Sequence, residues 1–217
     1  MPQRSFWLLV VGSWLWIAVL AACAPPAPDW HGSVYEPSRL APDFEVEGTD
    51  GAPLQLADFA GQPLLLYFGY TSCPDFCPTT MADLSWVFSQ LGDESDQAKV
   101  LFITVDLERD TPDRLTRYLE KFNPGFLGGR PRDGARLQAV VDAFDAYAQK
   151  DAPSAPSGDE AALPHAHEGQ AAEAVTFTHS ARVFLIDGEG RLITNYAFAT
   201  LREEILADVQ RAIEQGG

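Results

Sequence analysis

The sequence has little positive charge. Its 217 residues include 15 lysines and arginines against 31 aspartates and glutamates, a formal net charge of −16. Nucleic-acid binding needs Lys and Arg to neutralise phosphates, so this balance argues against a nucleic-acid partner. It agrees equally with an ordinary solvated surface and with a cationic partner, such as a basic protein face or a metal ion. With 46% apolar residues, the chain can bury the core of one domain of ordinary size.

Cysteine is also scarce, and two of the three cysteines lie four residues apart. Cys73 and Cys77 occur in the stretch YFGYTSCPDFCPTTMADLS, directly after an apolar run and before a helical pattern. Such a pair can be a structural disulfide, two buried thiols, a redox pair or part of a soft-metal site. The rest of the chain has to distinguish these alternatives.

The third cysteine, Cys23, follows an export signal. Arg4 precedes the uncharged apolar run FWLLVVGSWLWIAVL, and the run leads into LAAC at residues 20–23. LAAC resembles the bacterial lipobox, whose cysteine is lipidated and becomes the first mature residue. We therefore expect residues 1–22 to be a signal peptide of the lipoprotein type and Cys23 to carry the lipid. The alternative is an uncleaved transmembrane anchor. Both place the domain outside the cytoplasm, tethered to a membrane and facing the periplasm or another extracytoplasmic space.

The remaining chain divides into a tether and one domain. Residues 23–40 are Pro-rich and predict an irregular tether, and residues 41–217 predict the folded domain. Within it, residues 151–174 are rich in Ala, Pro, Ser and Gly and predict a mobile insert. The expected elements, in chain order, are a hairpin around Asp50–Gly51, a strand at 63–70, a helix through 81–91, a strand at 100–106, a helix beginning at 111–112, a helix through 137–147, strands at 181–187 and 191–198, and a helix through 201–213.

This order of elements predicts an α/β fold. A parallel β-α-β unit followed by a β-β-α unit is the thioredoxin-like arrangement. The N-terminal hairpin extension and the additional helix before the last strands favour its peroxiredoxin-like branch.

Four chemically active residues should converge at one edge of the predicted sheet. Cys73 and Cys77 follow the carboxyl end of the strand at 63–70, and Asp106 lies at the same end of the next strand. The strand at 181–187 should run antiparallel to these, so His179, just before it, lies at the same edge. Thioredoxin-like oxidoreductases normally have a cis-proline there, whereas this chain has no proline between Val175 and the strand.

The spacing and residue types favour a soft metal. The pair is C-x-x-x-C, not the usual redox spacing C-x-x-C. Two thiolates and one imidazole suit Cu(I) and tolerate Cu(II). Pro74 and Pro78 stiffen the loop, and a nearby helix N-terminus is expected to lower the pKa of the thiols below the free value of about 8.5. A disulfide between the two cysteines remains compatible with the spacing.

Three blocks of the sequence together resemble the Sco (SenC) family of copper chaperones for cytochrome c oxidase. FGYTSCPDFCPTTMADL is similar to the family signature, VDLERDTPDRL to its next block and THSARVFLIDGEG to its histidine block, over roughly residues 40–213. The resemblance implies a thioredoxin-like fold and a copper ion held by Cys73, Cys77 and His179. The departures are Leu107, where the family often has proline, and the long insert at 151–174.

The resemblance also implies a function and partners. Family members deliver copper to the binuclear copper site of the oxidase, or reduce the cysteines of that site. We expect a metallochaperone whose partners are the copper-site subunit of a haem-copper oxidase and another copper chaperone or a thioredoxin-like reductant. The alternative is a thiol-disulfide reductase, which would use the redox disulfide of Cys73 and Cys77 without needing His179. A peroxidase is a weaker alternative, because the chain lacks a P-x-x-x-T-x-x-C context.

The other candidate residues carry weaker signals. Asp75 and Asp106 are ordinary turn and strand-end acids, or acceptors that tune the metal site from behind its ligands. His165 and His167 belong to a solvated loop, or form a transient additional copper site. His31, in the expected tether, carries no signal.

Overall fold

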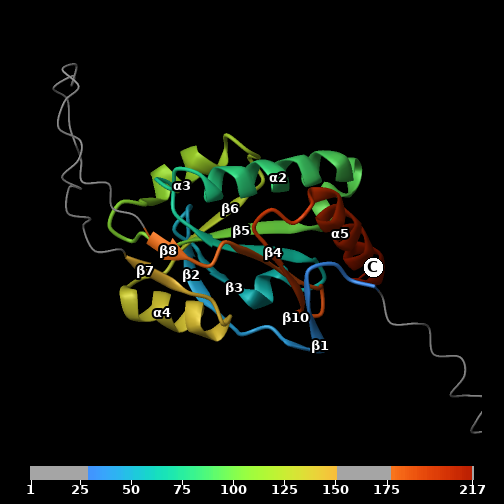
Figure 1. Cartoon of the computed structure of the whole chain (residues 1–217). Coiled ribbons are helices and arrows are strands. Elements are labelled where there is room, and N and C mark those ends of the chain that lie inside the picture. Colours follow the sequence, from blue (N-terminus) through green and yellow to red (C-terminus); the bar gives the residue numbers. More distant parts are fainter. Residues whose placement is uncertain (1–28, 151–176, 217) are drawn as a thin grey trace, which may run out of the picture.

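The centre of the fold is an eight-stranded mixed sheet (Figure 1). The computed structural model describes residues 29–150 and 177–216. The sheet has the strand order β1-β10-β9-β4-β5-β6-β2-β3, and β7 and β8 form a separate two-stranded sheet. The strands are β1 (Ser33–Leu40), β2 (Glu45–Gly48), β3 (Pro53–Gln55), β4 (Leu64–Gly69), β5 (Lys99–Thr104), β6 (Leu127–Arg130), β7 (Ala148–Lys150), β8 (Phe177–His179), β9 (Arg182–Ile186) and β10 (Arg191–Ala197).

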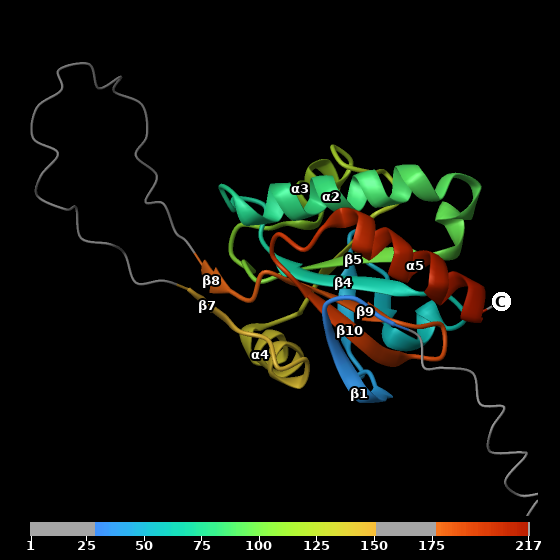
Figure 2. The same ribbon diagram turned by 45° about the vertical axis from the view of Figure 1, so that its right-hand side comes forward.

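Helices cover both faces of this sheet. Helices α2, α3 and α5 lie on one face and α4 lies on the other (Figures 1 and 2). The helices are α2 (Phe76–Leu91), α3 (Pro112–Leu119), α4 (Gly134–Ala143) and α5 (Arg202–Gly216), with short 3-10 helices at Leu56–Phe59 and Gly92–Gln97. The chain order is therefore β-α-β followed by β-β-α, which confirms the predicted thioredoxin-like fold.

Strand β4 is buried on both faces, which explains its unbroken apolar sequence. All six of its residues are buried, and it pairs in parallel with β5 and antiparallel with β9. On one face Tyr67 reaches Cys77 of α2. On the other, the Phe68 ring lies 5.9 Å from that of Phe144, which follows α4. The cysteine loop thus leaves the most deeply buried part of the sheet.

The start of α3 confirms its predicted capping signal. The Thr111 side chain accepts a hydrogen bond from the backbone N–H of Arg114, and Pro112 occupies the first turn. Proline fits there because the first helical N–H groups have no partner within the helix. This fixed start matters for the cysteine loop, because the residue just before the cap, Asp110, contacts that loop.

The segment before the domain is more ordered than expected. The sequence predicts an irregular tether through residue 40. This prediction is wrong for Ser33–Leu40, which form strand β1. This strand pairs antiparallel with β10, from Ser33 opposite Asn195 to Leu40 opposite Arg191. Its side chains are mostly exposed, so the sequence shows no alternation of apolar and polar residues. The strand forms because β10 offers an open edge, and an edge strand tolerates Pro37.

Strand β6 was also missed, because two glycines in LGGR argue against a strand. They are required by close packing against the N-terminal hairpin. A Cβ atom added to Gly129 would lie 2.7 Å from Cγ2 of Val46, which is too close for any larger residue. The expected helix through 137–147 ends earlier, at Ala143, and β7 follows.

A buried carboxylate attaches the N-terminal segment to α5, and His31 takes part. Asp208 is fully buried and accepts hydrogen bonds from the backbone N–H of His31 at 2.9 Å and from the Tyr196 hydroxyl at 2.9 Å. The His31 ring nitrogen Nδ1 lies 2.9 Å from the second oxygen, which also accepts from Arg211 at 3.1 Å. The role of His31 is structural, and the sequence carries no signal for it because a histidine that pairs with a buried acid has no local sequence mark.

Several predictions fall on residues outside the description. The signal peptide at 1–22, Cys23, the whole insert at 151–174, and His165 and His167 within it are among them. Within residues 29–150 and 177–216, no helix is both long and apolar enough to cross a membrane.

We predict that Asp208→Ala lowers the free energy of unfolding by about 2–4 kcal/mol, because it leaves the Tyr196 hydroxyl buried without its acceptor. Urea denaturation measures this change. His31→Ala is the matched control, since the His31 side chain is 39% exposed and its pairing should contribute less than about 1 kcal/mol. Equal losses in the two variants would contradict the assignment of Asp208 as the anchor.

Candidate metal and redox centre

The two cysteines lie next to each other at the junction of strand β4 and helix α2. Cys73 lies in the connecting loop and Cys77 in the first turn of the helix, and neither forms a disulfide. Both are buried, with exposed fractions of 8% for Cys73 and 0% for Cys77. The backbone N–H of Cys77 donates a hydrogen bond to the Cys73 sulfur at 3.3 Å. The helix start therefore holds the two thiols side by side, with Cys73 nearer the surface.

The electrostatics of Cys77 differ from the prediction. The helix N-terminus was expected to lower the thiol pKa, but the pKa of Cys77 is raised, first by its hydrogen bond with Cys73 and then by burial. The Tyr67 hydroxyl donates to the Cys77 sulfur at 3.6 Å, which only partly offsets these effects. The neighbouring sulfur and burial therefore both favour the neutral form of the Cys77 thiol.

Three tyrosines line the cysteine pair, and no pattern in the sequence distinguishes them from other core aromatics. Burial raises the pKa of Tyr67, Tyr70 and Tyr118, and both cysteines contribute to each shift. The Tyr118 hydroxyl is buried and has no hydrogen-bond partner within the described part of the chain. In the sequence these residues belong to apolar patterns and look like ordinary core aromatics. Only the fold shows that their hydroxyls surround two sulfurs.

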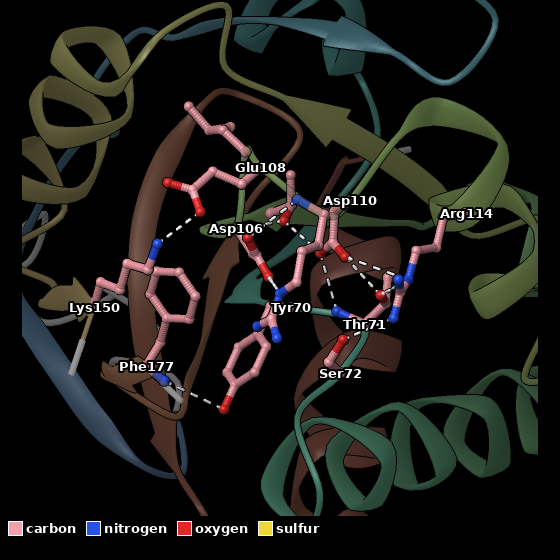
Figure 3. Close-up of polar contacts among 12 residues, drawn as sticks. Tyr70, Thr71, Ser72, Asp106, Glu108, Asp110, Arg114, Lys150 and Phe177 are labelled. Atoms are coloured by element: carbon pink, nitrogen blue, oxygen red, sulfur yellow. Dashed lines mark hydrogen bonds and ion pairs between the residues drawn. The ribbon is translucent and has the colours of Figure 1, made fainter. Parts of the chain in front are cut away.

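Asp110 fixes the loop that carries Cys73, as Figure 3 shows. Its side chain is fully buried and accepts hydrogen bonds from the Thr71 backbone N–H at 3.0 Å and from the Thr71 hydroxyl at 2.5 Å. The Thr104 hydroxyl, at the end of β5, donates to the same carboxylate at 2.6 Å. One acid therefore ties the cysteine loop to the neighbouring parallel strand.

Arg114 extends this network from the surface of α3. Its Nε donates to the Thr71 hydroxyl oxygen at 2.7 Å, and its terminal nitrogen donates to the Ser72 hydroxyl oxygen at 2.7 Å (Figure 3). The two residues before Cys73 are thus held by side chains of the β5–α3 segment. Asp110 was missed in the sequence because an acid next to a helix cap is common.

The two acids that were predicted to tune the site have other described contacts. Asp106 is buried and accepts hydrogen bonds from the backbone N–H of Arg109 at 3.2 Å and from the Arg109 side chain. Asp75 is exposed, and its backbone carbonyl accepts from the Thr79 hydroxyl at 2.9 Å. A tuning role for either acid stays a prediction.

Strand β8 runs beside the cysteine loop. The Phe177 backbone N–H donates to the Tyr70 hydroxyl at 3.4 Å, and the two rings lie 5.1 Å apart. The backbone of His179 pairs with Ala148 in β7. The side chain of His179 is outside the description, so its role as a ligand stays a prediction. Among the described side chains, no group of three or more His, Cys, Asp and Glu residues forms a metal site.

Two thiols in this arrangement support two kinds of chemistry. As thiolates they can bind a soft ion such as Cu(I), for which sulfur is the preferred ligand. They can also close a disulfide and exchange it with another thiol pair. The geometry of the cysteines alone does not require either one.

Known proteins share both the sequence and the fold. A SCO2-like protein of Rickettsia felis is 27% identical over 175 residues, which cover 80% of this chain and 78% of that protein. The structure of ScoI from Bradyrhizobium japonicum with copper bound matches with a TM-score of 0.65 and 30% identity, covering 80% of this chain and 99% of that one. Apo Sco1 from Thermus thermophilus matches with a TM-score of 0.67 and 28% identity, over 86% and 99%. The SCO1/SenC family model matches residues 33–214. This chain therefore belongs to the SCO1/SenC family.

Proposed function

We propose that this protein binds copper and delivers it to the binuclear copper site of a haem-copper oxidase. The observation that carries the proposal is the pair of buried cysteines, Cys73 and Cys77, which lie next to each other at the start of α2. The copper-bound ScoI structure, at 30% identity over most of this chain, supports it.

The residues present fit copper as a cargo. Cys73 and Cys77 supply two sulfur ligands, and His179 would supply an imidazole from the adjacent strand β8. Because the pKa of Cys77 is raised, binding must displace its proton, and copper affinity should increase with pH. Release would proceed by ligand exchange, in which thiolates of the acceptor replace the sulfurs one at a time. Cys73 would exchange first, since it is the more exposed of the two.

A thiol-disulfide reductase is the second candidate function. The hydrogen bond between the Cys77 and Cys73 side chains supports this candidate, because it brings the two sulfurs close to each other. A reductase would pass two electrons from these sulfurs to the cysteines of the oxidase subunit. It would not need the imidazole of His179, and this difference separates the two functions.

We further propose that the protein is exported and anchored in the membrane by a lipid on Cys23. The support is the apolar leader followed by LAAC. The first described residue, Asp29, lies only a few residues beyond Cys23, and Arg211 of α5 donates to its carbonyl at 2.8 Å. A lipid at Cys23 would therefore hold the domain close to the membrane surface.

Substitution of each ligand tests the choice between chaperone and reductase. Cys73→Ser and Cys77→Ser should each abolish tight Cu(I) binding, because one sulfur and an imidazole remain. His179→Ala should retain Cu(I) on two sulfurs while Cu(II) affinity falls roughly tenfold or more, since Cu(II) favours nitrogen donors. Competition with a chelator of known affinity measures both constants.

The same variants can be compared in cells at limiting copper. If copper delivery is the function, all three variants should fail to assemble the oxidase, and added copper should restore assembly. Full assembly with His179→Ala, together with failure of both cysteine variants, would show that reduction is the function.

The Asp110 network predicts that copper binding depends on the loop as well as on the ligands. Asp110→Ala should release the loop, so that iodoacetamide alkylates the reduced thiols about tenfold faster and Cu(I) binds more weakly. Asp110→Asn, which keeps one acceptor oxygen, should have an intermediate effect. Asp113→Ala is the control, because Asp113 is an exposed acid in the first turn of α3. Wild-type alkylation rates in both Asp110 variants would contradict a positioning role.

Mass spectrometry of the membrane-extracted protein tests the anchor. We expect a mature N-terminus at Cys23 that carries acyl chains, and a soluble, unlipidated form for Cys23→Ser. An intact leader followed by unmodified Cys23 would instead support an uncleaved transmembrane anchor.

A further inference from the structure

Two exposed phenylalanines lie beside the cysteine pair. Phe76, between the two cysteines, is 49% exposed, and Phe198, in the loop after β10, is 41% exposed. Their rings meet edge to face, with centroids 4.7 Å apart. Leu201, three residues after Phe198 and just before α5, is 62% exposed. Large apolar side chains grouped on a surface are characteristic of protein interaction sites.

The loop that presents Phe198 is held in a specific conformation. The hydroxyl and the backbone N–H of Thr200 both donate to the carbonyl of Ala197, at 2.8 and 3.1 Å. Between them, Ala199 adopts a left-handed conformation with φ of 68°, which costs about 1–2 kcal/mol for a residue other than glycine. Strain of this kind persists only where the surrounding contacts impose it. Phe198 is therefore fixed toward Phe76.

Acidic residues surround this apolar centre. Asp75 precedes Phe76 and is exposed, and Asp83 lines a small cavity together with Phe198. Burial raises the pKa of Asp83, Arg202 lowers it and Glu203 raises it. Arg202 also forms an ion pair with Glu203 at 3.5 Å. Arg202 is the nearby cation, and its guanidinium stacks on the Trp86 ring at 4.3 Å from the centroid. Three carboxylates, those of Asp75, Asp83 and Glu203, and one arginine give the border of this apolar surface a net negative charge.

We propose that this surface docks a protein segment that carries an apolar anchor between lysines or arginines, next to its own pair of cysteines. The docking surface consists of Phe76, Phe198 and Leu201 with the rim acids Asp75, Asp83 and Glu203. The anchor would cover the two phenylalanines, and the basic residues would pair with the rim and speed the encounter. Because Phe76 lies between the cysteines, the docked segment would have its thiols beside Cys73. This inference deepens the proposed function, on which it rests, by defining the chemistry of the partner.

Thiol-disulfide exchange provides a direct readout. The protein is first converted by oxidised glutathione to the Cys73–Cys77 disulfide, and glutathione is removed. A peptide thiolate then attacks one sulfur, which forms a mixed disulfide and frees the other cysteine. The second peptide thiol breaks the mixed disulfide, so the protein gains two electrons and two protons and the peptide leaves as a disulfide.

Three synthetic peptides with the same C-x-x-x-C pair serve as probes: one carries Phe between lysines, one Phe between glutamates and one Ser between lysines. The first should reduce the protein about tenfold faster than either of the others at low salt. High salt should remove its advantage over the glutamate peptide but not over the serine peptide, because only the charge contribution is screened. Equal rates for the three peptides would overturn the proposal.

Substitutions in the protein test which of its residues cause the difference in rate among the peptides. Phe198→Ser should remove the advantage of the phenylalanine anchor, and Glu203→Gln should reduce the advantage of lysine. The matched controls are Leu40→Ser, an exposed leucine opposite Arg191 at the far end of β10, and Glu214→Gln, near the other end of α5. Reduction by dithiothreitol should change less than twofold in all four variants, which excludes an altered disulfide. If the controls slow the first peptide as much as Phe198→Ser does, the surface is wrongly placed.

The proposed function can fail separately from this inference. Absence of Cu(I) binding by the reduced wild-type protein would contradict copper delivery, whatever the peptide rates. Normal Cu(I) binding without discrimination among the peptides would contradict the docking surface alone.

Discussion

The position of the loop that carries Cys73 depends on one buried carboxylate. Asp110, between β5 and α3, accepts hydrogen bonds from the backbone and side chain of Thr71 and from Thr104. It thereby joins the loop after β4 to the strand beside it. A buried charge is stable only with such partners, and its loss leaves them unpaired as well. The position of Cys73 relative to the sheet thus follows from an interaction several residues away from the sulfur.

Burial also determines the chemistry of the pair. Cys77 lies inside the first turn of α2, where the helix dipole favours a thiolate, yet the pKa of Cys77 is raised by the neighbouring sulfur and by the loss of water. A raised pKa and burial both lower the reactivity of a thiol toward reagents in solution. The exposed pair of Phe76 and Phe198 lies at the same end of the molecule. A buried reactive pair next to an apolar surface fits a protein whose reaction partners are other proteins.

The sequence predicted the elements that carry strong local signals. The unbroken apolar run of β4 and the Thr-Pro-Asp start of α3 each specify one structure, so both predictions are confirmed. Strands β1 and β6 could not be predicted, because an exposed edge strand lacks alternation and two glycines lower strand propensity. The proximity of Cys73 and Cys77 could be predicted from their spacing. The roles of Asp110 and Tyr118 could not be predicted, because they arise from contacts between elements that are far apart in the chain. The raised pKa of Cys77 could not be predicted either, because spacing does not reveal how deeply a side chain is buried.

We propose that Cys73 and Cys77 together hold copper as a cargo. X-ray absorption spectroscopy at the copper edge, on reduced protein loaded with one equivalent of Cu(I), measures the ligands of the bound ion. We expect two sulfur ligands and one nitrogen ligand, with one sulfur lost in Cys73→Ser. Copper surrounded only by nitrogen and oxygen, or a sulfur count that Cys73→Ser leaves unchanged, would contradict this proposal.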